Sequence, residues 1–213
     1  MNQPQNWKLL IGESQVNEII ESLALKIKVA FKGMNFVIVP VMMGASYLCT
    51  DLSRALGRMN VHHVYHSISS SSYDGQVQTE SKILLGDINK FKDLDVLIFD
   101  ELFDTGKTFH EIKEILIKEH QFNAESIHTC AAFIKNKPEF KYDLPDIHGI
   151  YIPDVWVVGC GLDDNGYYRY LNSLYATPKI EELKHLCSKE DLMFEDENYY
   201  KSFFEGNKFV YTV

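Results

Sequence analysis

Hydrophobic and polar residues follow two alternating patterns along the chain. Continuous apolar runs, typical of strands that are buried on both faces of a sheet, occur at residues 35–41, 96–99, 127–134 and 155–158. Apolar residues spaced three and four positions apart, typical of amphipathic helices, occur at residues 15–31, at 45–56 and from Thr108 onward. Because strands and helices alternate, the pattern predicts an α/β fold with a central, mostly parallel sheet.

Capping and turn-forming residues set the expected limits of these elements. Ser14 is the expected N-cap of the first helix. Pro40 has no N–H to donate, so the strand at 35–41 is expected to fray or bend there. The serine-rich residues 67–81 predict a mobile loop before a short returning strand, and the prolines within 138–153 predict an irregular segment.

Composition and charge narrow the range of functions. The 213 residues are 46% hydrophobic, which suits one globular domain, and the net charge of −9 argues against a nucleic-acid partner. The cysteines are far apart and predict neither a zinc site nor a disulfide framework. The first ten residues lack the features of a signal peptide, and no apolar run reaches the roughly 20 residues of a membrane helix. The expected location is therefore a reducing cytoplasm, without a membrane partner.

The division of the chain is expected near residue 176. Residues 1–176 contain all the strand and helix patterns described above. Residues 177–213 are acidic and rich in aromatic side chains, which are unfavourable to leave in solvent. We expect them to form a C-terminal extension that packs on the first domain or on a second subunit.

Residues 95–108, DVLIFDELFDTGKT, carry the most informative motif. Apolar residues lead to Asp100 and Glu101, and a small polar loop then precedes a helix. This arrangement presents carboxylates and a helix N-terminus at the carboxyl end of a parallel sheet, where open α/β folds bind ligands. It is not a Walker loop, because Glu101 stands where that motif requires glycine.

The motif resembles the phosphoribosyl pyrophosphate (PRPP) signature of type I phosphoribosyltransferases, in particular the hypoxanthine-guanine branch. That branch usually has Glu before Asp, whereas this chain has Asp100 before Glu101. The resemblance implies a three-layer sandwich with a small hood and a flexible lid loop. It implies that Asp100 and Glu101 bind the ribose hydroxyls and Mg²⁺, and that Asp104 is the catalytic base. The 5′-phosphate would be bound by Thr105, Gly106, Lys107 and Thr108.

Two further segments resemble parts of the same family that surround the reacting atoms, its pyrophosphate loop and its lid. Met43 and Gly44 match its pyrophosphate loop, in which a cis peptide is expected between residues 42 and 43. Ser72 and Tyr73 match a pair in the lid that covers the transition state.

The base-recognition region of the family is matched by residues 135 and 154–171. The resemblance implies that Lys135 donates to the purine O6, that Trp156 stacks on the purine and that the backbone of Val157 meets the base edge. Asp163 would lie near the purine N2 and the second metal, and Arg169 would hold pyrophosphate.

The expected activity is Mg²⁺-dependent purine salvage, in which hypoxanthine or guanine and PRPP give the nucleoside monophosphate and pyrophosphate. Two alternatives stay open, a xanthine-preferring transferase and a non-catalytic PRPP-sensing regulator. The resemblance also implies a homodimer or a homotetramer.

Overall fold

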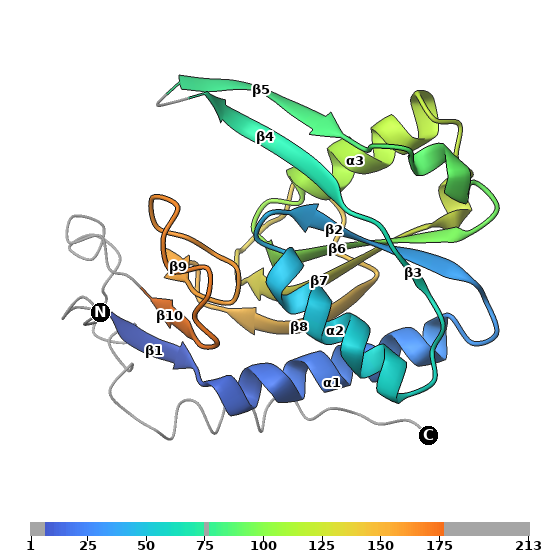
Figure 1. Ribbon diagram of the computed structural model, residues 1–213. Helices are drawn as coiled ribbons and strands as arrows, with labels where there is room; N and C mark the ends of the chain where they lie inside the picture. Colours follow the sequence, from blue (N-terminus) through green and yellow to red (C-terminus); the bar gives the residue numbers. More distant parts are fainter. Residues whose placement is uncertain (1–6, 75–76, 177–213) are drawn as a thin grey trace. The chain divides into compact units, whose positions relative to one another are not determined.

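The computed structural model describes the backbone of residues 7–74 and 77–176, and their side chains except those of residues 69–84 (Figure 1). The helices are α1 (Glu13–Ala30), α2 (Ser46–Arg58) and α3 (Lys107–Lys118), with short 3₁₀ turns at Ile88–Phe91 and Ala124–Ser126. The strands are β1 (Lys8–Ile11), β2 (Phe36–Met42), β3 (Val64–Tyr65), β4 (Ile68–Asp74), β5 (Val77–Leu84), β6 (Asp95–Phe103), β7 (Ile127–Lys135), β8 (Ile147–Ile152), β9 (Val157–Val158) and β10 (Leu174–Ala176).

The larger sheet has the strand order β5-β4-β2-β6-β7-β8, and β3 also pairs with β2. All of its neighbouring strands are parallel except β4 and β5. The apolar runs of β2, β6 and β7 form its centre and are almost completely buried. This confirms the predicted α/β fold with a central, mostly parallel sheet.

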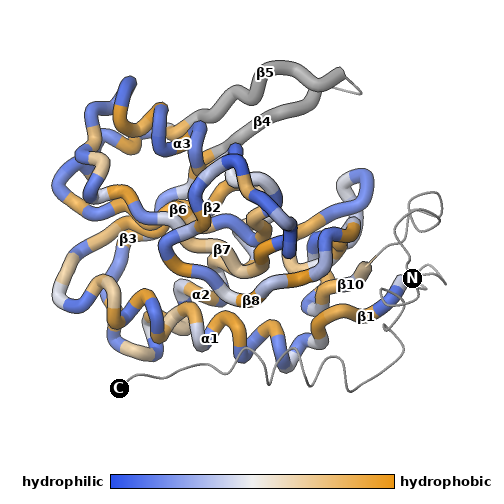
Figure 2. The backbone as a smooth tube through the Cα atoms, turned by 180° about the vertical axis from the view of Figure 1, so that it is seen from behind, coloured by the Kyte–Doolittle hydropathy of each residue, from blue (hydrophilic) through white to orange (hydrophobic). Residues whose placement is uncertain are grey.

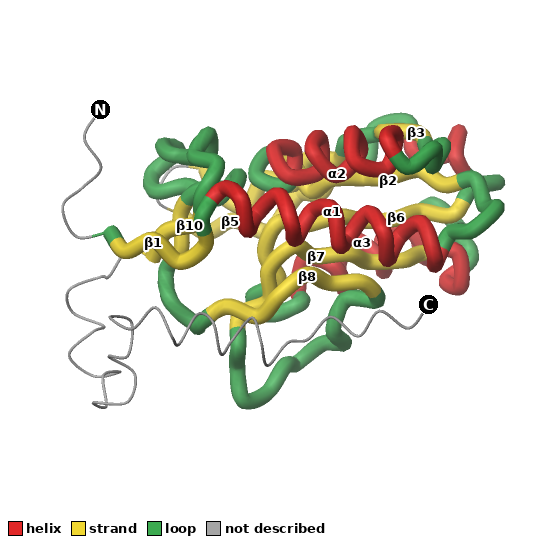
Figure 3. The backbone as a smooth tube through the Cα atoms, turned by 90° about the horizontal axis from the view of Figure 1, so that it is seen from below, coloured by secondary structure: helices red, strands yellow, loops and turns green. Residues whose placement is uncertain are grey.

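Helices cover both faces of the larger sheet. Figure 1 shows α3 on one side of the strands and α1 and α2 on the other, and Figure 3 shows α1 and α2 side by side. Each helix buries one apolar stripe, for example Phe109, Ile112 and Leu116 of α3. Hydrophobic residues accordingly follow the central strands and recur along α1 in Figure 2. The result is the predicted three-layer sandwich.

A second, three-stranded antiparallel sheet has the order β1-β10-β9. It pairs Lys8 with Ala176 and Ala176 with Val157, so it joins the two ends of the described chain to the segment that follows β8. This sheet corresponds to the predicted hood, and it fixes the position of Val157.

Some predicted limits of the elements were wrong. The first helix is preceded by Gly12 rather than Ser14, and Gly12 N–H donates to Gln15 Oε1 at 2.9 Å. The strand β2 also continues through Pro40 without fraying. Ile38 O accepts from His66 N, so Ile38 and Pro40 direct their backbone groups to the same side of β2, at the interruption between β3 and β4. The missing N–H therefore costs no ladder hydrogen bond.

Two predicted irregular segments contain strands. Residues 67–81 were expected to be a loop, but β4 and β5 form an antiparallel hairpin there, with Ser69 paired to Leu84. Residues 138–153 contain β8, which pairs with the carboxyl half of β7. In both cases tertiary pairing outweighs a sequence rich in turn-forming residues.

The expected C-terminal extension, residues 177–213, lies outside the described residues. Among the residues that the structure does describe, none of the helices is long and apolar enough to span a membrane.

Close packing of α1 on the sheet predicts that β8 does not tolerate a side chain at Gly149. A Cβ atom there would lie 2.2 Å from Ala132 O and 2.8 Å from Ile19 Cγ2. Since the β7 backbone cannot move aside, Gly149→Ala is expected to lower the free energy of unfolding by about 2 kcal/mol in urea titrations. Gly57→Ala in α2 is the control, because a Cβ there meets nothing within 4 Å. Equal stability of the two variants would contradict the prediction.

Candidate active site

The acidic pair lies inside β6, not after it as the sequence pattern suggested. β6 continues to Phe103, and Asp100 pairs with Ala131 of β7. Glu101 is buried, and its backbone N–H donates to Asp100 Oδ1 at 3.0 Å. The two carboxylates are therefore held by ladder hydrogen bonds at the carboxyl end of the sheet, where a rigid backbone fixes their positions.

Three segments that are distant in sequence pack in succession, Glu101 against Gly44 and Gly44 against Gly161. A Cβ atom at Gly44 would lie 1.8 Å from Glu101 Oε1, so the carboxylate occupies the space that any side chain at residue 44 would need. A Cβ atom at Gly161, whose φ is +99°, would lie 2.1 Å from Gly44 O. The pyrophosphate loop is therefore packed between β6 and the turn after β9, and both glycines are required by close approach.

The expected cis peptide is present between Met42 and Met43. Met43 itself is exposed, and its carbonyl accepts a hydrogen bond from Ser46 Oγ at 2.6 Å. Met43 therefore contributes backbone rather than a polar side chain to this loop.

Burial raises the pKa of both carboxyls of the acidic pair. Burial is the largest cause for Asp100, and the charge of Glu101 adds to it. Burial also raises the pKa of Glu101, although a hydrogen bond with Asp100 and the charge of Arg169 oppose the change. Such a pair is costly to ionise without a cationic or hydrogen-bonding ligand.

The acidic pair fits a role in holding Mg²⁺ and ribose hydroxyls. Glu101 Oε2 is buried and has no hydrogen-bond partner among the described residues, so an oxygen ligand is available. Within the described part of the chain, no three His, Cys, Asp or Glu side chains are grouped as a complete metal site. Since Mg²⁺ keeps several waters and binds substrate oxygens, one or two carboxylates are sufficient.

The predicted phosphate loop leads directly into α3. Gly106, at φ +82°, is the N-cap, and a Cβ there would lie 2.8 Å from the Phe103 ring and 3.0 Å from Tyr142 Cβ. Lys107 N–H donates weakly to Thr105 Oγ1 at 3.4 Å, whereas Lys107 Nζ pairs with Glu111. The first N–H groups of α3 have no acceptor within the helix, so the loop is suited to bind an anion.

Asp104 belongs to a cluster of four charges, in which the sequence identified only Asp104 and Lys135. Lys135 Nζ lies 3.3 Å from Asp104 and 3.4 Å from Asp154, and Lys137 Nζ also pairs with both acids. Partial burial would raise the pKa of Asp104, but the hydrogen bond from Lys137 and the charge of Lys135 outweigh it, so the pKa lies below its ordinary value. The alternation of Lys135 and Lys137 at the carboxyl end of β7 was the available sequence signal.

Arg169 and Asp163 are brought together next to Gly161. Arg169 Nη2 lies 2.6 Å from Asp163 Oδ1, and Nη1 donates to Gly161 O at 2.7 Å. Asp163 also accepts from Gly166 N–H at 2.7 Å. Both charged side chains influence the pKa of Glu101, so they lie within electrostatic range of the acidic pair.

The predicted purine residues Lys135, Trp156 and Val157 come from the end of β7 and the start of β9. Lys135 is the last residue of β7 and is largely buried, whereas Trp156 is 45% exposed just before β9. Asp154, two residues before Trp156, is the ion partner of Lys135 and links these two positions. Val157 is buried, and its backbone pairs with β10.

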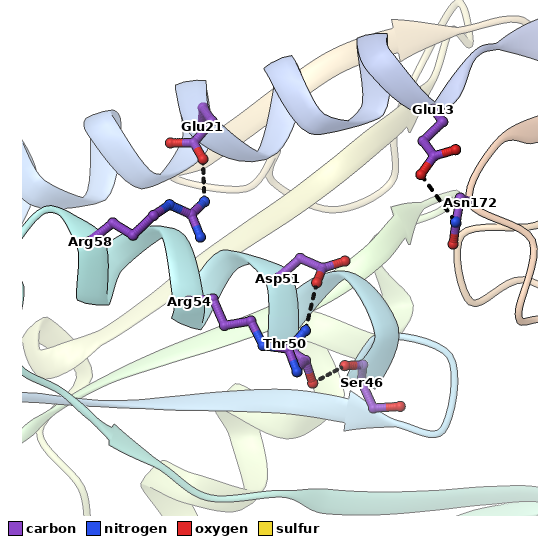
Figure 4. A network of polar contacts seen from close by, with 8 residues as sticks. All are labelled: Glu13, Glu21, Ser46, Thr50, Asp51, Arg54, Arg58 and Asn172. Carbon is purple, nitrogen blue, oxygen red and sulfur yellow. Dashed lines mark hydrogen bonds and ion pairs between the residues drawn. The ribbon is translucent and has the colours of Figure 1, made fainter.

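A cavity of about 560 Å³ lies behind the pyrophosphate loop. It is lined by the first turns of α1 and α2 and by the segment 169–172, and Figure 4 shows the polar side chains of this region, including Ser46, Thr50, Arg54 and Asn172. Its lining includes Arg169 but not Asp104, Lys135 or Trp156, so it is not the space in which a base and a ribose would react.

The predicted lid residues Ser72 and Tyr73 lie in β4 of the hairpin. Tyr73 pairs with Gln78, next to a shift in the strand register. Their side chains lie outside the described residues, so a contact with the substrate stays a prediction.

The fold and site define a class of transferase that acts on sugar phosphates. A sheet edge that carries an acidic pair, a phosphate loop at a helix N-terminus and a glycine-lined pyrophosphate loop is expected for phosphoribosyltransferases. A family model described as "Phosphoribosyl transferase domain" matches residues 12–165.

Individual relatives narrow the class. The hypoxanthine-guanine phosphoribosyltransferase of Aquifex aeolicus is 31% identical over 79% of this chain and 93% of its own. The enzyme of the same name from Dictyostelium discoideum is 28% identical over 86% of this chain and 98% of its own. A crystal structure of a Bacillus anthracis hypoxanthine-guanine phosphoribosyltransferase is 28% identical, with a TM-score of 0.67 over 80% of this chain and 99% of that one. The chain belongs to the hypoxanthine-guanine phosphoribosyltransferase family, which confirms the resemblance.

The raised pKa values predict that the acidic pair destabilises the free protein at neutral pH. The folded state binds more protons than the unfolded chain between about pH 4 and the raised pKa values, so the free energy of unfolding falls as pH rises through that window. Glu101→Gln removes one charge. It is expected to raise the free energy of unfolding by about 1 kcal/mol near pH 7, and less near pH 4, in EDTA.

Urea titration at both pH values provides the measurement. Glu18→Gln, at an exposed position on α1, is the matched control and is expected to change neither value. A lower free energy of unfolding near pH 7 in Glu101→Gln than in wild type would contradict the prediction that the acidic pair destabilises the free protein.

Proposed function

We propose that this protein transfers the phosphoribosyl group of PRPP to hypoxanthine or guanine and releases pyrophosphate, with Mg²⁺ as cofactor. The ion pair of Asp104 and Lys135, at 3.3 Å, is the observation on which the proposal rests. N7 and O6 are neighbours on one edge of a purine. A carboxylate beside an ammonium therefore matches N7–H and O6 of the same base.

The lowered pKa of Asp104 is compatible with proton transfer in this reaction. The carboxylate is ionised at neutral pH, although it is a weak base. As N9 attacks C1 of the ribose, the imidazole ring gains positive charge and its N7 proton becomes acidic. A weak but permanently ionised base next to N7 is then sufficient.

The other groups of the site bind and orient PRPP in this proposal. The loop from Thr105 to Thr108 binds the 5′-phosphate, and Asp100 and Glu101 accept from the ribose hydroxyls. Their negative charges also favour the positive charge that develops on the ribose as the C1–O bond breaks. Mg²⁺, held by Asp100, Glu101 or Asp163 together with substrate oxygens, would neutralise charge on the leaving pyrophosphate.

The pyrophosphate and the base are bound by segments that flank this centre. The Met43–Gly44 backbone and Arg169 would hold pyrophosphate. The contacts of Arg169 with Asp163 and Gly161 O do not use all five of its N–H donors, so others can bind a phosphate oxygen. Trp156 would stack on the purine, and Ser72 and Tyr73 would exclude water.

An assay with purified protein, PRPP, Mg²⁺ and single purines tests this proposal. We expect hypoxanthine or guanine to be converted to its nucleoside monophosphate, which chromatography detects. No product is expected when EDTA replaces Mg²⁺. Product with xanthine alone would identify the xanthine-preferring alternative. Binding of PRPP without product from any base would identify a PRPP sensor and overturn the enzymatic proposal.

Replacement of the proposed base separates chemistry from binding. Asp104→Asn is expected to lower kcat by roughly 10²–10⁴ while the Kd for PRPP, measured by calorimetry, changes little. Asp143→Asn, at an exposed position between β7 and β8, is the matched control. Wild-type kcat in Asp104→Asn would remove the catalytic role of this residue.

The expected homodimer or homotetramer and the cytoplasmic location stay predictions. Light scattering on the purified chain tests the first of these.

A further inference from the structure

Two members of the four-charge cluster have no part in the reaction as proposed above. Lys137 follows β7 by two residues, and Asp154 follows β8 by two residues. Both lysines contact both acids, with Lys135–Asp154 at 3.4 Å and Lys137–Asp154 at 3.7 Å. The cluster is therefore a closed ring of alternating charge, with the proposed base as one of its corners.

The two lysines are placed differently within this ring. The Lys135 side chain is 11% exposed and that of Lys137 is 22% exposed, whereas the two acids are nearly half exposed. Lys107, the nearest lysine in the phosphate loop, pairs with Glu111 on its own helix at 3.5 Å. Among the described residues, Asp104 forms ion pairs with Lys135 and Lys137.

Purine binding sets the two lysines apart. Lys135 has three N–H donors and contacts two acids, so the purine O6 would be a third acceptor for the same ammonium group. Asp104 would then share this cation with the purine at the moment at which it has to be ionised and directed at N7. Lys137 remains in contact with both acids, so Asp104 keeps a second ammonium group beside it.

We propose that Lys137 is a positioning residue for the phosphoribosyl transfer: it holds the Asp104 carboxylate ionised and in place, which leaves Lys135 available to bind the purine. This inference rests on the proposed function. Asp154 also takes part in this arrangement. It pairs with the Lys135 and Lys137 ammonium groups and balances their charge, so that the ring stays electrically neutral.

The titration of the groups agrees with this arrangement. The hydrogen bond to Asp104 is the largest cause that raises the pKa of Lys137, so its ammonium is retained throughout the neutral range. Without Lys137, burial would act on Asp104 against Lys135 alone, and the pKa of the acid would rise toward its ordinary value.

Lys137→Met tests the inference by steady-state kinetics as a function of pH. We expect KM for the purine to rise by about threefold to tenfold, because both acids then compete for Lys135, while KM for PRPP stays within about twofold of wild type. We also expect the acid limb of the kcat/KM profile to move to higher pH, because Asp104 has to be ionised to accept a proton. Lys137→Arg keeps the charge and should restore both parameters.

A charge-matched control and a second readout make the result decisive. Lys118→Met removes a lysine that pairs with Glu114 on the exposed side of α3, and it should leave both kinetic parameters at wild-type values. In the free protein, carboxyl ¹³C NMR, with the Asp104 signal assigned through Asp104→Asn, should show that Asp104 titrates at higher pH in Lys137→Met than in wild type.

The possible failures are distinguishable. Absence of nucleotide formation by the wild-type protein would overturn the proposed function. The role of Lys137 would be overturned if the wild-type protein is active and Lys137→Met has the same purine KM and the same acid limb as Lys118→Met. A lower melting temperature in Lys137→Met without either kinetic change would show that Lys137 only stabilises the loop after β7, and would also overturn it.

Discussion

The Glu101 carboxylate occupies the space in which residue 44 would otherwise carry a side chain, and the Gly44 carbonyl in turn lies where a Cβ of Gly161 would be. This close approach joins β6, the loop after β2 and the turn after β9 into one surface at the carboxyl edge of the sheet. A methyl group at either glycine would separate segments that have to bind parts of one substrate. The geometry of the site therefore depends on the absence of side chains at Gly44 and Gly161.

The same sheet edge keeps two kinds of acid in opposite electrostatic conditions. The pKa values of Asp100 and Glu101 are raised, mainly because removal from water disfavours their charged forms. Asp104, three residues after Glu101, lies between two lysines that lower its pKa. In the proposed reaction, Asp100 and Glu101 become ionised when a cationic ligand or a developing positive charge is present. Asp104 is already ionised and can accept a proton. A change of three positions along the chain, from the end of β6 into the loop that follows, is sufficient to separate these roles.

Much of this arrangement was predictable from the chain. The apolar runs that became β2, β6 and β7 are continuous because these strands are buried on both faces, and the 95–108 motif indicated both the family and the loop before α3. The errors lie where tertiary contacts decide the outcome. Pro40 is tolerated because it faces a gap between β3 and β4, and β8 forms at the sheet edge despite its neighbouring prolines.

The roles of Lys137 and Asp154 illustrate why local sequence is not enough. Each is an ordinary charged residue in a polar segment, and neither belongs to the motif around Asp104. They become part of the site only because β8 pairs in parallel with β7, which brings the residues after both strands to the same edge of the sheet. There, each acid meets two ammonium groups. The electrostatic state of the proposed base is consequently set by a strand pairing that the apolar pattern did not reveal.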